Sequence, residues 1–99
     1  MTVRILIKRR FKEGHFFEID NMIKMVRHGA MNQPGYISSE TMWDHEDPFR
    51  VVIASTWRDK QSWDNWKNSP ERHAKEKEFE SFLDGRTEFE LYDLGMYPH

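Results

Sequence analysis

The residues whose types and spacing could do chemistry lie between Trp57 and His73, a stretch that holds three of the four tryptophans. The indole ring of Trp66 could stack on a flat aromatic compound and donate its N–H to an oxygen atom. The neutral imidazole of His73 could accept a phenolic proton near neutral pH. These residue types therefore suit the binding and deprotonation of a small aromatic molecule.

Both residues also have a plain structural explanation. Trp63 and Trp66 lie three positions apart, so on a helix they share one face and could simply anchor that helix in the core. His73 lies in the charged segment ERHAKEKE, where a histidine is most often a solvated surface residue. Substrate binding and ordinary packing both remain open for this stretch.

Two other charged segments suggest metal or nucleic-acid binding but fit neither. Asp44 to Asp47 reads DHED, and consecutive residues in a tight loop cannot easily converge on one metal ion, so we interpret it as a solvated turn. Lys8 to Arg10 is basic, but residues 51–57 lack the glycines and exposed aromatic pairs with which RNA-recognition domains stack bases. The net charge of −2 also gives no general attraction to nucleic acid or anionic membranes.

Hydrophobic periodicity predicts the elements that must position these residues. Apolar side chains alternate, as in strands, over residues 2–11, 36–43, 50–57 and 87–94. They recur every three or four positions over residues 15–31, which predicts an amphipathic helix. Asp59 suits the N-cap of a short helix that holds Trp63 and Trp66.

A second helical piece begins at Ser69-Pro70 and continues to about Leu83. We expect it to turn Ala74, Phe79, Phe82 and Leu83 inward and its charges, over residues 75–80, to solvent. The element order β-α-β-β-α-β predicts a ferredoxin-like antiparallel sheet of the α+β class, as one domain over residues 1–99.

Residues 51–57 carry apolar side chains on both faces of the expected strand. Val51, Ile53 and Trp57 lie on one face, and Val52 and Ala54 on the other. The two helical regions can cover only one face of the sheet, and an uncovered apolar face normally marks an interface. We therefore predict a homodimer in which two sheets pack face to face.

The composition favours a cytoplasmic protein. The chain has no cysteine, which excludes disulfides and thiolate chemistry. The apolar run near the start, in MTVRILIKRR, is too short for a signal peptide, and no stretch has the length that spans a bilayer. We expect no membrane partner.

The segments PGYISSE, VVIASTW, DKQSWDNWKNSPER and TEFELYDL together resemble the antibiotic biosynthesis monooxygenase domain of the dimeric α/β-barrel superfamily. The resemblance covers nearly the whole chain. It implies a dimeric α/β barrel and a monooxygenase without cofactor or metal. The implied substrate is a small electron-rich aromatic of the quinol or polyphenol type, bound between sheet and helices.

Under this resemblance we predict Trp66 and His73 as the catalytic residues, with Trp66 orienting the substrate and His73 as the acid–base group. Tyr36, Trp57 and Arg86 are the predicted substrate-binding residues. The first alternative is a non-catalytic dimer that binds a small hydrophobic molecule or stabilises a partner. It would be favoured if Phe79, Phe82 and Met25 filled the space around Trp66.

The second alternative is haem degradation, a reaction found elsewhere in the superfamily. The resemblance assigns that branch an Asn, a Trp and a His. Trp66 matches the Trp, but the Asn falls on Ile7 or Lys8 and the His falls near Glu76. We therefore predict no stoichiometric haem complex with turnover.

Overall fold

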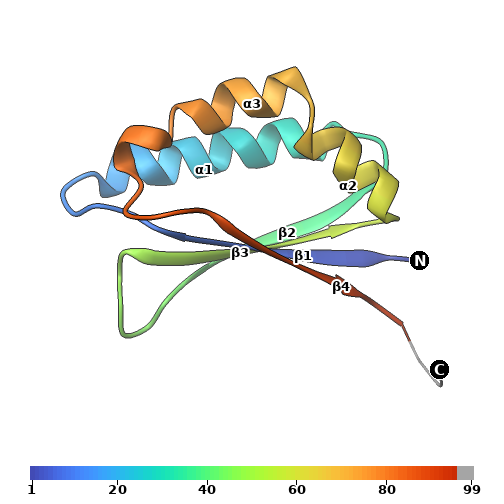
Figure 1. The fold of residues 1–99 in the computed structure, drawn as a ribbon, viewed down its shortest axis with the longest axis horizontal. Coiled ribbons are helices and arrows are strands. Elements are labelled where there is room, and N and C mark those ends of the chain that lie inside the picture. The colour runs from blue at the N-terminus through green and yellow to red at the C-terminus, as the bar shows by residue number, and fades with distance from the viewer. Residues whose placement is uncertain (96–99) are drawn as a thin grey trace.

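The computed structural model describes residues 1–95 and shows a four-stranded antiparallel sheet with its helices on one side (Figure 1). The strands are β1 (Val3–Arg10), β2 (Tyr36–Trp43), β3 (Arg50–Trp57) and β4 (Glu88–Asp93). The helices are α1 (Phe16–Met31), α2 (Lys60–Lys67) and α3 (Pro70–Lys77), followed by the 3₁₀ turn η1 (Glu80–Phe82). The predicted α+β, ferredoxin-like order is confirmed. Among the described residues, no helix has the length and apolar character needed to cross a bilayer.

The strand order β2-β3-β1-β4 places β1 and β3 in the middle of the sheet. Ile7 pairs with Ile53 on β3 and with Phe89 on β4, so these three side chains share the face that the helices cover. The core beneath the helices has two parts. One is built around Trp57, Trp63 and Trp66, and the other around Phe11, Phe79 and Val51.

The predicted helix starts are confirmed by their hydrogen bonds. Asp59 Oδ1 accepts from the backbone N–H of Ser62 at 2.8 Å and from its hydroxyl at 2.7 Å. Ser69 Oγ accepts from the backbone N–H of Arg72 at 3.1 Å, and Pro70 is the first residue of α3. These caps satisfy N–H groups that have no partner within a helix.

The prediction for α3 was partly wrong. The α-helix ends at Lys77 rather than near Leu83, and the chain continues as the short 3₁₀ turn. Phe79 is buried as predicted, but Ala74 is exposed. The residues that α3 turns inward are Arg72 and Glu76, whose spacing of four places them on one stripe of the helix with Phe79.

Two glycines allow the close contacts that fix α2. Gly29 on α1 lies against the ring of Trp66, where a Cβ atom would be 2.8 Å from Trp66 Cη2. Gly35, with φ +86°, lies against Ser62, and its carbonyl accepts from the backbone N–H of Arg58 at 2.7 Å. A side chain at either glycine would displace α2 and therefore the tryptophans that it carries.

No helix covers the opposite face of the sheet within the described residues (Figure 1). Leu6, Met42 and Val52 form an apolar strip on this face, between charged residues. Arg4 Nε donates to Thr56 Oγ1 at 3.1 Å, and Lys8 pairs with Glu90 at 2.9 Å. Long polar side chains therefore shield part of this face, while the strip stays partly exposed.

Removing the Asp59 cap should destabilise the protein most at neutral pH. Hydrogen bonds from the Ser62 hydroxyl and backbone N–H hold the pKa of Asp59 below its ordinary value of 3.8. A depressed folded-state pKa contributes stability above the unfolded-state value, and that contribution disappears as the pH falls through the folded-state value. The Asp59→Ala variant should therefore melt at a lower temperature than the wild type near pH 7, with a smaller difference near about pH 2.

The matched control is Asp59→Asn, which keeps an acceptor oxygen at the N-cap without the charge. It should lose less stability than Asp59→Ala, and its difference from the wild type should still shrink at low pH. Melting curves followed by circular dichroism provide the measurement. An equal Asp59→Ala deficit at both pH values would contradict the capping role.

Candidate functional site

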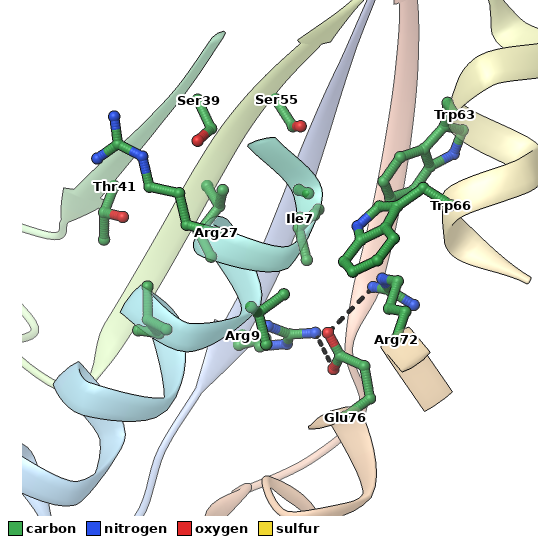
Figure 2. Close-up of a pocket in the computed structure, with 14 residues that line it drawn as sticks. Ile7, Arg9, Arg27, Ser39, Thr41, Ser55, Trp63, Trp66, Arg72 and Glu76 are labelled. Atoms are coloured by element: carbon green, nitrogen blue, oxygen red, sulfur yellow. Dashed lines mark hydrogen bonds and ion pairs between the residues drawn. The ribbon is translucent and has the colours of Figure 1, made fainter. Parts of the chain in front are cut away.

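A cavity lies between the inner face of the sheet and the three helices (Figure 2). Aliphatic side chains from β1, β3 and α1 form its middle, and the indoles of Trp63 and Trp66 form one wall. The volume of the cavity is about 30 Å³, which is enough for about two or three waters. It is therefore a narrow space, apolar along its walls and polar at its ends.

One polar end is formed by hydroxyl groups of β2 and β3. Ser39, Thr41 and Ser55 line this end, and the exposed Arg27 of α1 lies beside them (Figure 2). Short hydroxyls can donate and accept hydrogen bonds, so this end can hold the oxygen atoms of a ligand.

The predicted binding residues Tyr36 and Trp57 lie behind these hydroxyls and do not line the cavity. The Tyr36 hydroxyl shares a hydrogen bond with Ser39 Oγ at 2.8 Å, and Trp57 Nε1 donates to Ser55 Oγ at 2.7 Å. The two rings also pack edge to face at 5.5 Å between centroids. Tyr36 and Trp57 therefore orient the hydroxyls that a ligand would contact.

The predicted residues His73 and Arg86 do not line the cavity beside Trp66. The His73 side chain is exposed and borders a shallow surface hollow with Glu76 and Lys77. Arg86 is exposed near Asp84 and the basic end of β1. Their roles in catalysis and binding stay predictions, and the structure does not bring these side chains to Trp66.

The side chains that could have filled the space around Trp66 lie elsewhere. Phe79 packs against Phe11 at 5.8 Å between ring centroids, in the other part of the core. The rings of Phe82 and His15 lie 4.9 Å apart between centroids, and the Met25 side chain on α1 is 47 % exposed. The cavity beside Trp66 is therefore left open by these three residues.

The other polar end is a group of three charged side chains, two buried arginines and a half-buried glutamate, none of which was predicted from the sequence as a site residue. Arg9 on β1 forms an ion pair through Nη2 with Glu76 Oε2 and donates from Nε to Thr87 Oγ1 at 3.2 Å. Arg72 places Nη2 3.2 Å from the other oxygen, Glu76 Oε1. Glu76 therefore lies between two arginines from different elements (Figure 2).

This arginine–glutamate–arginine group is charged and incompletely hydrogen-bonded. Arg72 Nε, Arg72 Nη2 and Glu76 Oε1 are buried without a hydrogen-bond partner, so the 3.2 Å contact is an ion pair with poor hydrogen-bond geometry. Burial lowers the pKa of Arg72, the charge of Glu76 opposes that shift, and the charge of Arg9 adds to it. Two positive charges and one negative charge leave one net positive charge at this end of the cavity.

The sequence contains a signal for this group. The alternation of β1 that places Val3, Ile5 and Ile7 inside also places Arg9 inside, where a charge needs a partner. Arg72 and Glu76 have the i, i+4 spacing of a helical ion pair. Neither signal identifies which acid meets Arg9, because that contact depends on how α3 packs on the sheet.

The sequence profile of the antibiotic biosynthesis monooxygenase family matches residues 2–80. The chain belongs to this family. The matched segment runs from the start of β1 to the end of α3, so it includes Trp66 and all three members of the charged group. No curated protein sequence matches this chain closely enough to count as a relative.

Solved structures share the fold of this antibiotic biosynthesis monooxygenase family member at low sequence identity. A conserved protein from Methanosarcina mazei Go1 is 22 % identical, with a TM-score of 0.86 over 93 % of this chain and 91 % of its own. SnoaB from Streptomyces nogalater, described as a cofactor-independent oxygenase, is 12 % identical, with a TM-score of 0.85 over 97 % and 95 %. Rv0793 from Mycobacterium tuberculosis is 9 % identical, with a TM-score of 0.85 over both whole chains.

Replacing Glu76 should be strongly destabilising. The Glu76→Gln variant leaves Arg9 and Arg72 buried without a counter-charge, which should reduce the free energy of unfolding by about 3–5 kcal/mol. The control Glu78→Gln changes an exposed glutamate at the end of the same helix and should alter it by less than about 0.5 kcal/mol. Urea denaturation measures both values, and equal effects of the two substitutions would contradict the structural role of the ion pairs.

Proposed function

We propose that the protein is a cofactor-independent monooxygenase that acts on a small electron-rich aromatic compound bound beside Trp66. The observation that carries this proposal is the cavity, which has indole and aliphatic walls and polar groups at both ends, in a chain that belongs to a monooxygenase family. Its walls must move apart to admit a ring, because the space of about 30 Å³ holds only about two or three waters. The fold shared with SnoaB, described as a cofactor-independent oxygenase, supports the same class of reaction.

A quinol- or polyphenol-like compound suits this site chemically. The walls offer apolar contact and stacking to a flat ring, and the hydroxyls of Ser39, Thr41 and Ser55 can hydrogen-bond to its oxygens. In an oxygenation without cofactor, the substrate supplies all the electrons. A ring C–H of the quinol becomes C–OH with one atom of dioxygen, the two phenolic groups become quinone carbonyls, and the other oxygen atom leaves as water with the two phenolic hydrogens. Only an electron-rich, readily deprotonated compound gives up electrons in this way.

The lining of the cavity does not fit haem. It contains no histidine, cysteine, methionine or tyrosine among the described residues, and these are the side chains that hold haem iron. Ile7 and Glu76, at the positions where the resemblance expects Asn and His, both line the cavity with Trp66. Neither of them supplies a nitrogen ligand to haem iron.

Filling the cavity with a larger side chain should lower turnover. Val26 is a half-buried residue of α1 that lines the cavity, and Val26→Phe would place a ring in the space the substrate needs. We expect oxygen uptake with a panel of hydroquinones to fall by about tenfold or more in this variant, since a displaced substrate loses its near-attack geometry.

The matched control is Met25→Phe, which adds a ring at the neighbouring exposed position outside the cavity. It should leave oxygen uptake unchanged. Wild-type protein that consumes no oxygen with any hydroquinone would overturn the proposed function. The narrow space of about 30 Å³ would then favour the alternative of a non-catalytic protein that binds a small hydrophobic molecule.

We also propose a homodimer built on the open face of the sheet. The apolar strip of Leu6, Met42 and Val52 lies on this face, and the buried residues Ala54 and Thr56 follow Val52 along β3 on the same face. Packing two such strips against each other would remove them from water and complete the second layer that the sheet lacks.

Sedimentation should show the wild type at about twice the monomer mass of 12.1 kDa at micromolar concentration. Val52→Glu buries a charge in the proposed interface and should shift the protein to monomer or make it insoluble. The control Met25→Glu places the same charge on the exposed side of α1 and should remain dimeric. A wild-type protein that sediments only as a monomer would exclude this interface.

A further inference from the structure

Three atoms at the charged end of the cavity have no hydrogen bond, and they define the kind of group that could bind there. Arg72 Nε and Nη2 are donors on one edge of the guanidinium, and Glu76 Oε1 beside them is an acceptor. Arg72 is only 5 % exposed, and its side chain extends toward Trp66 and Trp63 at the cavity wall (Figure 2). An oxygen that enters as the 3.2 Å contact between Arg72 and Glu76 opens could accept from Arg72 and carry a hydrogen for Glu76, and it would then satisfy all three atoms.

We propose that Glu76 and Arg72 are catalytic residues that deprotonate a phenolic hydroxyl of the substrate, with Glu76 as the general base and Arg72 as the donor to the resulting oxyanion. This inference rests on the proposed function and names the end of the cavity where its first step occurs. It also assigns the role of general base to Glu76, which lines the cavity, in place of His73, which lies outside it.

The step is a single proton transfer. The phenolic O–H bond breaks, Glu76 Oε1 takes the proton, and the electron pair stays on the phenolic oxygen, which Arg72 Nε and Nη2 then hold. Glu76 also borders the surface hollow beside His73 and Lys77, so its proton can pass to solvent. The substrate leaves this step as a phenolate, the electron-rich form that reacts with dioxygen.

The electrostatics of this end favour the ionised substrate. The charged groups that face it are Arg9 from β1 and Arg72 and Glu76 from α3, while Arg27 of α1 lies at the other end. Their one net positive charge, with little water present, stabilises a phenolate more than a neutral phenol. The same positive charge makes the bound phenol a stronger acid.

The arrangement selects a phenol over a carboxylate. A carboxylate is only an acceptor when ionised, so its second oxygen would lie against the negatively charged Glu76 Oε1 and be repelled. A phenol offers one oxygen that both donates and accepts. The substrate should therefore enter with a free hydroxyl leading, and its methyl ether should not be accepted.

The test uses 4-nitrophenol, whose phenolate absorbs visible light, so that its ionisation can be followed on the protein. Wild-type protein should bind the phenolate at least about tenfold more tightly than the phenol, which lowers the pKa of the bound probe by about one unit or more. Arg72→Met should remove this preference, because it deletes both the donor and the net positive charge of the group. It also removes the repulsion between Arg72 and Arg9. Lys77→Met, an exposed change on the same helix, should retain it.

Oxygen uptake separates the role of Glu76 from that of Arg72. Glu76→Gln should still bind 4-nitrophenolate but lose about 100-fold or more in uptake with hydroquinones, the usual effect of removing a general base. If Glu76→Gln fails to fold, Arg72→Met still tests the site. Loss of uptake in His73→Ala but not in Glu76→Gln would overturn the assignment.

The outcomes of the two assays are independent. Wild-type protein that binds neither form of the probe, or both equally well, overturns the inference even if hydroquinones are oxygenated, and the proposed function then stands. Protein that ionises the probe through Arg72 but takes up no oxygen supports the deprotonating site and overturns the monooxygenase.

Discussion

A single charged side chain on the buried face of the central strand determines how the last third of the chain packs. Arg9 is 3 % exposed, and a guanidinium cannot be buried without acceptors. Glu76 from α3 and Thr87 before β4 supply them, and the ring of Phe79 lies 4.8 Å from the guanidinium carbon. The helix, the turn after it and the edge strand are thus placed around one cation.

This requirement also explains why the cavity has two different ends. Beside β2 and β3, hydroxyl groups are held by neighbouring aromatic side chains, as in the contact between Trp57 and Ser55. Beside α3, the charged side chains form ion pairs with one another, and the guanidinium carbon of Arg72 lies 5.5 Å from the ring centroid of Trp63. A molecule lying along the cavity would meet neutral hydrogen-bonding groups at one end and a net positive charge at the other.

The sequence predicts the framework well because its signals are local. The alternation of residues 36–43 and the caps at Asp59 and Ser69 each depend on neighbours within a few positions, and all three are confirmed. The site was harder to predict. His73 and Arg72 are adjacent, but neighbouring residues on a helix point in directions about 100° apart, so only one of them can face the core.

The choice between those two residues requires the packing of α3, which no local pattern provides. A histidine in a charged segment suggests chemistry, whereas an arginine and a glutamate four positions apart suggest a solvated pair. The partner that draws this pair inward is Arg9, which lies 67 positions before Glu76. Arg9 is the one charged residue on the buried face of β1, so the sequence indicated that an acidic side chain elsewhere in the chain had to pair with it.

The central position of β1 also affects how the protein is made. Among the described elements β1 comes first in the chain, yet one of its two neighbours in the sheet is β4, the last of them. Until β4 and α3 have been synthesised, one edge of β1 offers unpaired backbone groups to other chains, and Arg9 has no counter-charge. The nascent chain can assemble the β2-β3-β1 part of the sheet, but the charged end of the cavity can form only after α3 has been synthesised.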